Sequence, residues 1–364
     1  MLKNNKQKSD QYCAVLVFGD IGRSPRMQNH ALEIVKNTNY KTYMIGYLDF
    51  HNYGYTILKL NLKNRIILFF AKFYEQFFGS KCHFSFCVSQ NMKKDLEKNW
   101  KIKSNVLYDK AQLDIFEILQ LEQKHEVYKK LGLLVKNNKS IQVNSKQEEE
   151  ETLFTIKNLN TKQTVYKSDR PILIISSTSW TKDEDFSILL NAMIAYEQMA
   201  QSDIQNSYVK LQLIITGKGP EKKMYENKIF TLKSQNKWQF IDIQTLWLEA
   251  EDYPKLLASA DLGICLHYSS SGFDLPMKVV DMFGAGLPVF AINYDSIQEL
   301  VQDSYNGKIF QNSETLFKLL KEQFQNWPQN QQNLEFLKQN AIKFREKSFE
   351  DEWKNVVYPI ISQI

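Results

Sequence analysis

The chain has 364 residues, which is long enough for two globular domains. Of these residues 43% are hydrophobic and 13% aromatic, a composition that excludes a disordered chain. Its net charge of +5 is unevenly spread: residues 1–135 carry 21 Lys and Arg against 12 Asp and Glu, and the remaining residues carry 25 against 29. The basic front half suggests an anionic partner, such as a phosphate group or an anionic membrane face. A lysine-rich surface that only confers solubility fits the charge equally well, and motifs have to decide between the two.

In the front half, apolar runs predict strands over residues 13–18, 42–48, 84–88 and 104–108, and amphipathic spacing predicts helices over 29–37, 64–78 and 91–98. The 64–78 pattern is rich in Phe and Ile but is interrupted by charged and amide side chains, which fits a helix in a membrane interface or an aromatic core helix. No apolar run reaches the roughly 18 residues that a spanning helix needs. We therefore expect no transmembrane helix in this sequence.

The back half repeats the alternation of strand and helix more completely. Strands are predicted over 171–176, 210–216, 239–243, 262–266 and 287–292, and helices over 184–199, 221–235, 253–259, 276–285, 296–302 and 313–325. This pattern is typical of an α/β protein with parallel sheets. The predicted domains are a shortened α/β domain over 1–135, a polar linker over 136–168, a second α/β domain over 169–332, and C-terminal helices over 333–364 that could pack back across both.

The first strand runs into the turn FGDIGRSPRM, residues 18–27, immediately before a helix. A strand-to-helix junction offers free backbone N–H groups and the positive end of a helix dipole, which suits phosphate. Gly19 and Gly22 allow close approach of the backbone, and Arg23 and Arg26 can clamp phosphate oxygens. The turn matches neither G-x-G-x-x-G nor the P-loop pattern, and a plain turn with surface arginines is the alternative.

Two loops in the back half offer further polar groups at strand ends, where α/β proteins bind ligands. The strand over 171–176 is followed by a hydroxyl-rich loop with Thr178 and Ser179, and the next strand ends in the Gly-Lys-Gly turn of residues 217–219. The acids Asp183-Glu-Asp185 formally spell a D-x-D metal–nucleotide signature. We favour the ordinary role of acids in a first helical turn, with Thr181 as the N-cap.

Residues 248–291 hold the richest group of polar side chains. A strand over 261–267 leads through the serine-rich loop 269–272 into a helix beginning near Pro276, and Lys278 and Asp281 lie three residues apart on one face of that helix. A helix N-terminus, serine hydroxyls and a lysine together suit a nucleotide diphosphate, whose leaving-group charge they would stabilise.

The four cysteines do not indicate a metal site. Cys82-His83 with Cys87 lacks a second pair of ligands, and buried reduced thiols are the simpler expectation. The front half also has no basic helix motif, zinc knuckle or aromatic RNA-binding strand, so nucleic acid is not expected as a partner.

Several segments in order along the chain carry a resemblance to one family. They are GDIGRSPRMQNHAL, DFHNYGYT, KFYEQFFG, VSQNMKKDLEKNW, SSTSWTKDEDFSILL, ITGKGP, WLEAEDYPKLLASADLGICLHYSSSGFDLPMKVVDMFG and NGKIF. Together they resemble the chitobiosyldiphosphodolichol β-mannosyltransferase family. The resemblance implies a GT-B fold, in which two Rossmann-like domains face a cleft, with GDP-mannose as the donor and dolichol-diphosphate-linked chitobiose as the acceptor. It also implies the cytosolic face of the endoplasmic reticulum and, as further partners, other mannosyltransferases of the pathway.

The resemblance assigns roles to residues of this sequence. The expected donor-binding residues are Thr178, Ser179, Gly217, Lys218, Gly219, Ser270, Ser271, Gly272, Asp274, Lys278 and Asp281. The expected acceptor- or diphosphate-binding residues are Gly19, Gly22, Arg23, Arg26 and Asn52. An α-linked donor giving a β-linked product needs a general base, for which Asp20 is preferred over His51. No cofactor is firmly implied, and a divalent cation, Mg²⁺ or Mn²⁺, stays open.

The sequence departs from the family pattern between Tyr47 and Asp49. There the family has further strand–helix units, whereas here a strand and the DFHNYGY loop abut, so two or three βα units are missing. An incomplete gene model, a splice form and a divergent protein all fit. The alternative function is a non-catalytic or truncated relative that binds GDP-mannose or partners a glycosyltransferase complex.

Overall fold

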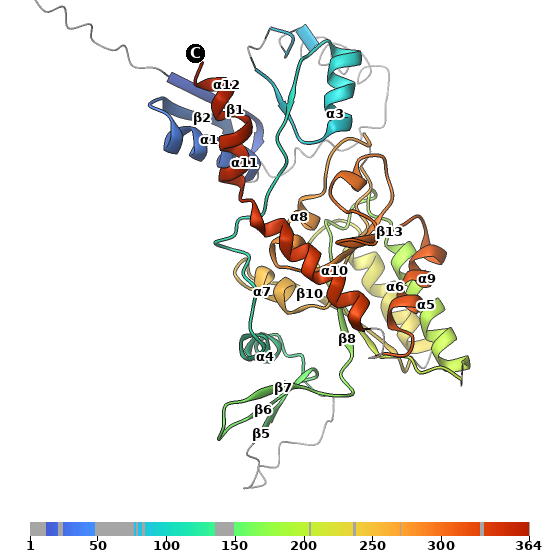
Figure 1. Ribbon diagram of the computed structural model, residues 1–364. Coiled ribbons are helices and arrows are strands. Elements are labelled where there is room, and N and C mark those ends of the chain that lie inside the picture. The colour runs from blue at the N-terminus through green and yellow to red at the C-terminus, as the bar shows by residue number, and fades with distance from the viewer. Residues whose placement is uncertain are drawn as a thin grey trace, which may run out of the picture. The chain divides into compact units, whose positions relative to one another are not determined.

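The computed structural model describes residues 12–20, 25–47, 76–77, 79–81, 84–134, 149–203, 205–235, 238–269, 271–327 and 331–363. The chain divides into two compact units (Figure 1). The first comprises Met1–Val88, Met92–Asp109 and Phe349–Ile364, and the second comprises Ser89–Asn91 and Lys110–Ser348. Among the described residues, no helix is both long enough and apolar enough to cross a bilayer.

The second unit is built on a six-stranded parallel sheet. Its strands lie in the order β10-β9-β8-β11-β12-β13. They are β8 (Ile172–Ser177), β9 (Leu211–Thr216), β10 (Ile241–Leu246), β11 (Leu262–Cys265), β12 (Val289–Ile292) and β13 (Gly307–Phe310). The chain order reverses between β8 and β11, so loops leaving the carboxyl ends of these two neighbours diverge and open a crevice.

Helices bury both faces of this sheet. On one side lie α5 (Phe186–Ser202), α6 (Lys222–Gln235) and α9 (Ser313–Phe324), and on the other lie α7 (Asp252–Ser259) and α8 (Met277–Gly284) (Figure 1). The helix α10 (Gln331–Lys343) contacts both α9 and α8, and its Leu334 and Leu337 pack in the same core cluster as α5 and α9. Every residue of β8 and β9 is buried, as is expected of central parallel strands that are covered on both faces. The Asn312 side chain caps α9 by accepting from the Thr315 backbone N–H at 3.0 Å.

The predicted strands of the back half are present, but three predictions there differ from the structure. The helix expected over 184–199 begins only at Phe186, because Asp185 caps it. The helix expected over 296–302 is a single 3₁₀ turn, Ile297–Glu299, and the strand β13 was not predicted at all. Strands of four residues such as β13 carry too little periodic signal to be recognised alone.

Residues 110–168 hold elements for which the sequence shows no clear period. These are α4 (Leu121–Lys130) and the antiparallel strands β5 (Glu149–Glu151), β6 (Thr155–Asn158) and β7 (Thr164–Tyr166). The strands pack on α4 through buried polar groups: His125 Nδ1 lies 2.8 Å from Thr155 Oγ1, and the Thr155 and Thr152 hydroxyls are 2.7 Å apart. Buried Phe154 and Tyr128 add an aromatic contact with ring centroids 4.6 Å apart.

The described part of the first unit has two separate parallel strand pairs. β1 (Tyr12–Asp20), α1 (Pro25–Asn37) and β2 (Lys41–Tyr47) form one βαβ unit. β3 (Phe86–Cys87), α3 (Gln90–Asp95), a π-helical turn over Leu96–Trp100 and β4 (Asn105–Val106) form the other. The helices α11 (Phe349–Val356) and α12 (Tyr358–Ile361) belong to this unit, where the fully buried Trp353 packs with Leu107 and Val357. Residues 48–75, which hold the predicted break and most of the predicted 64–78 helix, lie outside the described residues.

Candidate functional site

The loop that follows β8 is organised by one buried carboxylate, that of Glu184. Its side chain is only 2% exposed. Glu184 accepts hydrogen bonds from the Thr178 hydroxyl and from the backbone N–H of Ser179, the latter at 2.8 Å. A buried carboxylate is stable only when such donors and a cation satisfy it. The loop is therefore fixed at the carboxyl end of the strand, at the crevice between β8 and β11.

Lys278, from the first turn of α8, supplies that cation. Its ammonium group forms an ion pair with Glu184 and lies 3.4 Å from the Ser179 hydroxyl oxygen. The Lys278 side chain is 24% exposed, so the charge remains in contact with solvent. The structure thus brings together three predicted donor-binding residues, Lys278, Ser179 and Thr178. Glu184, which joins them, was not predicted as a site residue.

The Gly-Lys-Gly turn after β9 packs directly against this loop. A Cβ at Gly217 would lie 1.8 Å from the Thr178 carbonyl oxygen, and a Cβ at Gly219 would lie 1.7 Å from the Ser179 carbonyl oxygen. Gly217 also has a φ of +132°, which side chains rarely adopt. Both glycines are therefore needed for the two loops to meet. The intervening Lys218 holds its ammonium 3.6 Å from the centre of the Trp247 ring.

Trp180 fixes the same loop to the core of the second unit. It is buried, its backbone φ is +48°, and its indole N–H donates to the Gly217 carbonyl at 3.3 Å. Its ring packs on Phe186 and Tyr225, with centroid distances of 4.7 and 5.8 Å. A left-handed conformation in a bulky residue persists only where the surroundings hold it, which is common at ligand-binding loops.

A second polar network lies beyond the carboxyl end of β11. The Ser269 hydroxyl donates to Asp274, and the backbone N–H of Gly272 donates to the Ser269 hydroxyl at 2.9 Å. Gly272 has a φ of +77°, which the turn requires. Ser271 lies within the same turn, where its hydroxyl oxygen accepts from the backbone N–H of Phe273 at 3.2 Å. The predicted residues Ser271, Gly272 and Asp274 are therefore neighbours.

His267 connects the two networks. Its Nε2 lies 3.2 Å from Asp274 Oδ2 and its Nδ1 lies 3.4 Å from Asp183 Oδ2. The hydrogen bond from His267 is the main cause that lowers the pKa of Asp274 to about 2. Because Asp183 and Glu184 are adjacent, one dipeptide touches both loops. His267 was not predicted, although its place at the end of a strand of a parallel sheet was a signal that could have identified it.

The acids Asp183-Glu-Asp185 do not fill a first helical turn, as the sequence suggested. Only Asp185 serves the helix, by accepting from the backbone N–H of Ser187 at 2.9 Å. Thr181, the predicted N-cap, lies four residues before the cap. Asp183 and Glu184 precede the helix and have the specific partners described above, so the expectation for these two residues was wrong.

Asp281, the last predicted donor residue, is set apart from these hydrogen bonds. Burial alone raises the pKa of its carboxyl group to about 7. Among the described residues, its side chain has no hydrogen-bond or ion-pair partner. A carboxyl group in this state is available to a ligand hydroxyl as either donor or acceptor.

The predicted acceptor-side residues are described only in part. Gly19 and Asp20 end β1 opposite Tyr47, and only their backbone is described. Arg26 forms a bidentate pair with the buried Asp109, with nitrogen–oxygen distances of 2.8 and 2.5 Å. The predicted residues outside the described part of the chain are Gly22, Arg23, His51, Asn52 and Ser270.

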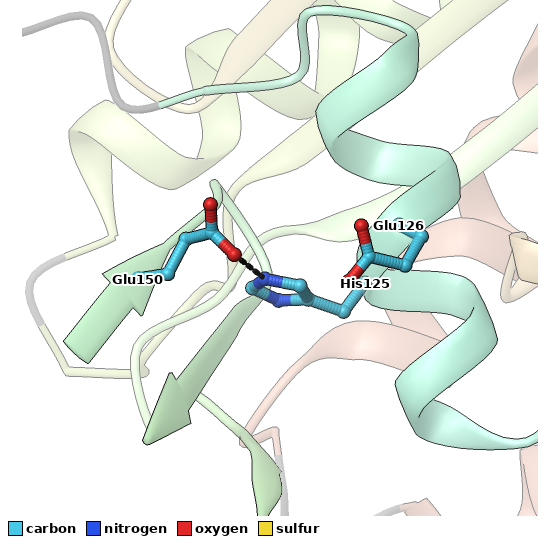
Figure 2. Close-up of side chains that lie close together, drawn as sticks. All are labelled: His125, Glu126 and Glu150. Atoms are coloured by element: carbon cyan, nitrogen blue, oxygen red, sulfur yellow. Dashed lines mark hydrogen bonds and ion pairs between the residues drawn. The ribbon is translucent and has the colours of Figure 1, made fainter. Parts of the chain in front are cut away.

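Another group of potential metal ligands lies at the contact of α4 with the hairpin. Figure 2 shows His125 between the carboxylates of Glu126 and Glu150, with atoms within 4.8 Å of one another. Each carboxylate is already paired with a lysine, Glu126 with Lys157 at 2.5 Å and Glu150 with Lys129 at 2.7 Å. Two ammonium groups disfavour a bound cation, so this cluster fits an ion-pair network that fastens the hairpin to α4 better than a metal centre.

Comparison with solved structures gives the fold. A glycosyltransferase from Rickettsia africae superposes with a TM-score of 0.61 at 12% identity, over 97% of this chain and 98% of that one. HepE from Anabaena superposes with a TM-score of 0.53 at 15% identity, over 78% of this chain and 64% of that one. These likenesses, with the parallel sheet, confirm the predicted GT-B fold.

Comparison of sequences gives the family. The family described as "Glycosyl transferases group 1" matches residues 161–344. The human chitobiosyldiphosphodolichol beta-mannosyltransferase is 40% identical over 318 residues, 86% of this chain and 66% of that protein. The UDP-glycosyltransferase TURAN of Arabidopsis thaliana is 40% identical over 338 residues, 87% of this chain and 70% of that protein.

The chain belongs to the glycosyl transferases group 1 and to the chitobiosyldiphosphodolichol beta-mannosyltransferase family, as the motifs indicated. It spans about two thirds of the length of the curated relatives that it matches.

Proposed function

We propose that this protein transfers mannose from GDP-mannose to chitobiosyl-diphosphodolichol, with inversion at the anomeric carbon, and so forms the first β-mannosyl linkage of the N-glycan precursor. The reaction would take place at the cytosolic face of the endoplasmic reticulum, with other mannosyltransferases of the pathway as neighbours. The observation that carries the proposal is the Lys278–Glu184 pair at the crevice between β8 and β11. The names of several relatives at about 40% identity support the acceptor and the sugar.

The pair is suited to a donor diphosphate for an electrostatic reason. Glu184 is nearly inaccessible, whereas Lys278 is partly exposed, so an arriving phosphate can reach the ammonium without touching the carboxylate. The Ser179 hydroxyl lies beside the same ammonium and adds a hydrogen-bond donor. Negative charge develops on the departing nucleoside diphosphate in the transition state, and preorganised donors placed there lower the barrier.

The two networks would divide the donor between them. The Thr178–Ser179 loop and the Gly217–Gly219 turn would hold the diphosphate through Lys278, Ser179 and backbone N–H groups. Asp281, whose carboxyl pKa is raised by burial to about 7, would exchange hydrogen bonds with hydroxyl groups of the nucleoside. Ser271, Gly272 and Asp274 would line the same crevice, with His267 keeping Asp274 ionised.

Inversion in a single displacement requires a base on the acceptor hydroxyl. We assign this role to Asp20, at the end of β1, with His51 as the second candidate. Gly19, Gly22, Arg23, Arg26 and Asn52 would bind the diphosphate of the acceptor. The basic balance of residues 1–135 is consistent with a lipid diphosphate at an anionic surface.

The alternative is a relative that binds GDP-mannose without turnover and acts within a glycosyltransferase complex. The observation in its favour is the length of the chain, about two thirds of that of its curated relatives. It shares the donor site with the main proposal, so the two differ in transfer and not in binding.

The test is a transfer assay with the full chain, labelled GDP-mannose and a synthetic chitobiosyl diphospholipid, run beside direct binding of GDP-mannose and of UDP-glucose. We expect a chitobiosyl lipid extended by one β-linked mannose. Asp20→Asn should abolish transfer while leaving GDP-mannose binding intact, and Lys278→Ala should weaken both.

Binding of GDP-mannose without transfer would support the alternative. Tighter binding of UDP-glucose than of GDP-mannose would contradict the assigned donor. Transfer that is unchanged in Lys278→Ala would contradict the assigned site.

A further inference from the structure

A pocket in the first unit lies outside every residue assigned to the transfer reaction. It has a volume of about 690 Å³ and is formed where α3, the π-helical turn and the start of β4 meet. Its walls carry three lysines, Lys93, Lys101 and Lys103, against one acid, Glu97. The Lys101 ammonium donates to the Lys98 carbonyl oxygen at 3.1 Å, but among the described residues none of these lysines is paired with a carboxylate, so the pocket keeps a net positive charge.

A buried hydroxyl without a partner lies in the same wall. Ser104 is 3% exposed, and its Oγ has no hydrogen-bond partner among the described residues. Leaving a buried hydroxyl unsatisfied costs about 1–3 kcal/mol, so native proteins seldom do so without a reason. A ligand oxygen that accepts from this hydroxyl and faces the lysines would remove both the unmet hydrogen bond and the charge repulsion.

The backbone at this pocket is also unusual. The turn over Leu96–Trp100 is π-helical, and Lys101 ends it with a φ of +57°. Such turns are rare and occur often at functional sites, because they redirect side chains that a regular helix would point elsewhere. Here the turn brings Lys101 and Lys103 into one wall with Lys93 of the preceding helix.

The neighbouring segment of the first unit connects the pocket with an exposed aromatic group. A Cβ at Gly79 would lie 2.6 Å from Ile102 Cδ1, so the Gly79 backbone packs against a residue of the pocket wall. Two residues before it, Phe77 is 48% exposed, and the Lys81 ammonium lies 5.9 Å from the centre of its ring. Aromatic rings beside lysines are typical of surfaces that lie at the headgroup level of a membrane.

We propose that this pocket binds the phosphate group of an anionic phospholipid headgroup and so holds the first unit on a membrane surface. Phosphate oxygens are strong acceptors, and lysine ammonium groups with a serine hydroxyl are their ordinary protein partners. The site is independent of the donor and acceptor residues, so its failure and the failure of the transfer reaction would be observed separately.

The experiment is sedimentation of the full chain with vesicles of phosphatidylcholine alone and of phosphatidylcholine mixed with phosphatidylinositol. We expect binding to the mixed vesicles. The triple variant Lys93→Gln, Lys101→Gln, Lys103→Gln should lose roughly 100-fold in partitioning, since each lysine at an anionic surface contributes about a factor of five. The matched control neutralises three exposed lysines of the second unit, Lys162, Lys223 and Lys228, and should bind like the wild type.

Ser104→Ala distinguishes a built pocket from diffuse charge. It should weaken binding to the mixed vesicles several-fold without lowering the midpoint of thermal unfolding, because the hydroxyl has no protein partner to lose. Equal loss in the control triple variant, or normal binding in both the pocket triple variant and Ser104→Ala, would overturn the proposal. Binding of inorganic phosphate in solution, with no binding to mixed vesicles, would overturn the assignment to a lipid.

Discussion

The described parts of the two units differ in how completely their strands join into one sheet. In the second unit, six parallel strands form one sheet, and Glu184, Lys278 and the two glycine-bearing turns fix the loops at its switch point. In the described part of the first unit, the strands form two separate pairs, and the arginine that the sequence offered for phosphate is paired with Asp109. The residues around Glu184 and Lys278 thus come from one continuous stretch of chain, Lys110–Ser348, whereas the first unit is assembled from segments far apart in sequence.

Removing Glu184 should have the largest effect on local stability, because its carboxylate holds the loops of the second unit together. Glu184→Ala leaves the Thr178 hydroxyl, the Ser179 N–H and the Lys278 ammonium without their common acceptor. Each buried donor left unsatisfied costs about 1–3 kcal/mol, so the Thr178 hydroxyl and the Ser179 N–H together account for about 2–6 kcal/mol, whereas the partly exposed Lys278 ammonium can turn to solvent. We expect a loss of this size in the protection of the β8 and β9 amides, measured by native-state hydrogen exchange.

The control for this variant is Glu314→Ala. Glu314 also pairs with a lysine, Lys318, but both side chains are exposed. This variant should leave the exchange of the same amides unchanged. Equal protection in Glu184→Ala and wild type would show that the carboxylate does not organise the loop.

The contact of the two loops is tested by Gly219→Ala. The added Cβ would meet the Ser179 carbonyl oxygen at 1.7 Å, so the β8 and β9 loops must separate. A displacement of about 1 Å in a reacting geometry can lower turnover by about 100-fold, and we expect a loss of that order in mannosyl transfer.

Gly132→Ala is the matched control, because Gly132 has a φ of +67° but open space where the Cβ would lie. It should retain turnover despite its backbone strain. A Gly219→Ala variant that turns over like Gly132→Ala would contradict the close packing of the loops.

The partly buried Asp281 predicts a pH dependence of stability in the second unit. Burial raises the pKa of its carboxyl group from 3.8 to about 7, so between these values the folded chain holds a proton that the unfolded chain has released. The free energy of unfolding therefore falls as pH rises through this window, by about 2–4 kcal/mol from this residue. Asp281→Asn should flatten the dependence and raise the unfolding midpoint at pH 7.

Thermal unfolding of wild type and Asp281→Asn across this range measures the difference. Asp274 contributes with the opposite sign, because the pKa of its carboxyl group is lowered from 3.8 to about 2. Its contribution to the free energy of unfolding is fully present above pH 3.8 and is lost as the pH falls to about 2. An identical pH profile for wild type and Asp281→Asn would contradict the burial of a neutral carboxyl group.

The smallest expected effect belongs to the first unit. Arg26→Lys keeps the charge but loses the bidentate fork toward Asp109. We expect the KM for the acceptor lipid to rise about fivefold, or about 1 kcal/mol, because lysine keeps the charge and one of the two hydrogen bonds, while the KM for GDP-mannose stays unchanged. Steady-state kinetics with each substrate varied separately measures this, and an equal change in both constants would argue against an acceptor-side role.

The parts of this fold that the sequence predicts are those with local signals. β8 and β9 are mostly apolar and rich in Ile and Leu, and the serine-rich loop before α8 is contiguous in sequence, so both the sheet and the cluster around Lys278 could be anticipated. The short strand β5 consists of three glutamates and has no apolar pattern. It exists because neighbouring strands and α4 pair with it, which is tertiary information.

The role of Glu184 was missed for a related reason. An acid just before a helix is ordinarily explained by the helix dipole, and the distinguishing fact is a partner 94 residues away, Lys278. The packing of α11 and α12 in the first unit depends on similarly remote contacts, such as that of Trp353 with Leu107. Pairings of this kind have no signature in one sequence.

The most direct test of the central claim is calorimetric titration of GDP-mannose into the full chain, its Lys278→Ala variant and the surface control Lys318→Ala. Removal of a charge-assisted hydrogen bond to phosphate typically costs about 1.5–3 kcal/mol. We predict that Lys278→Ala binds GDP-mannose about 10- to 100-fold more weakly than the wild type, while Lys318→Ala binds it equally well. Equal affinity in the wild type and Lys278→Ala would contradict the placement of the donor diphosphate at the crevice between β8 and β11.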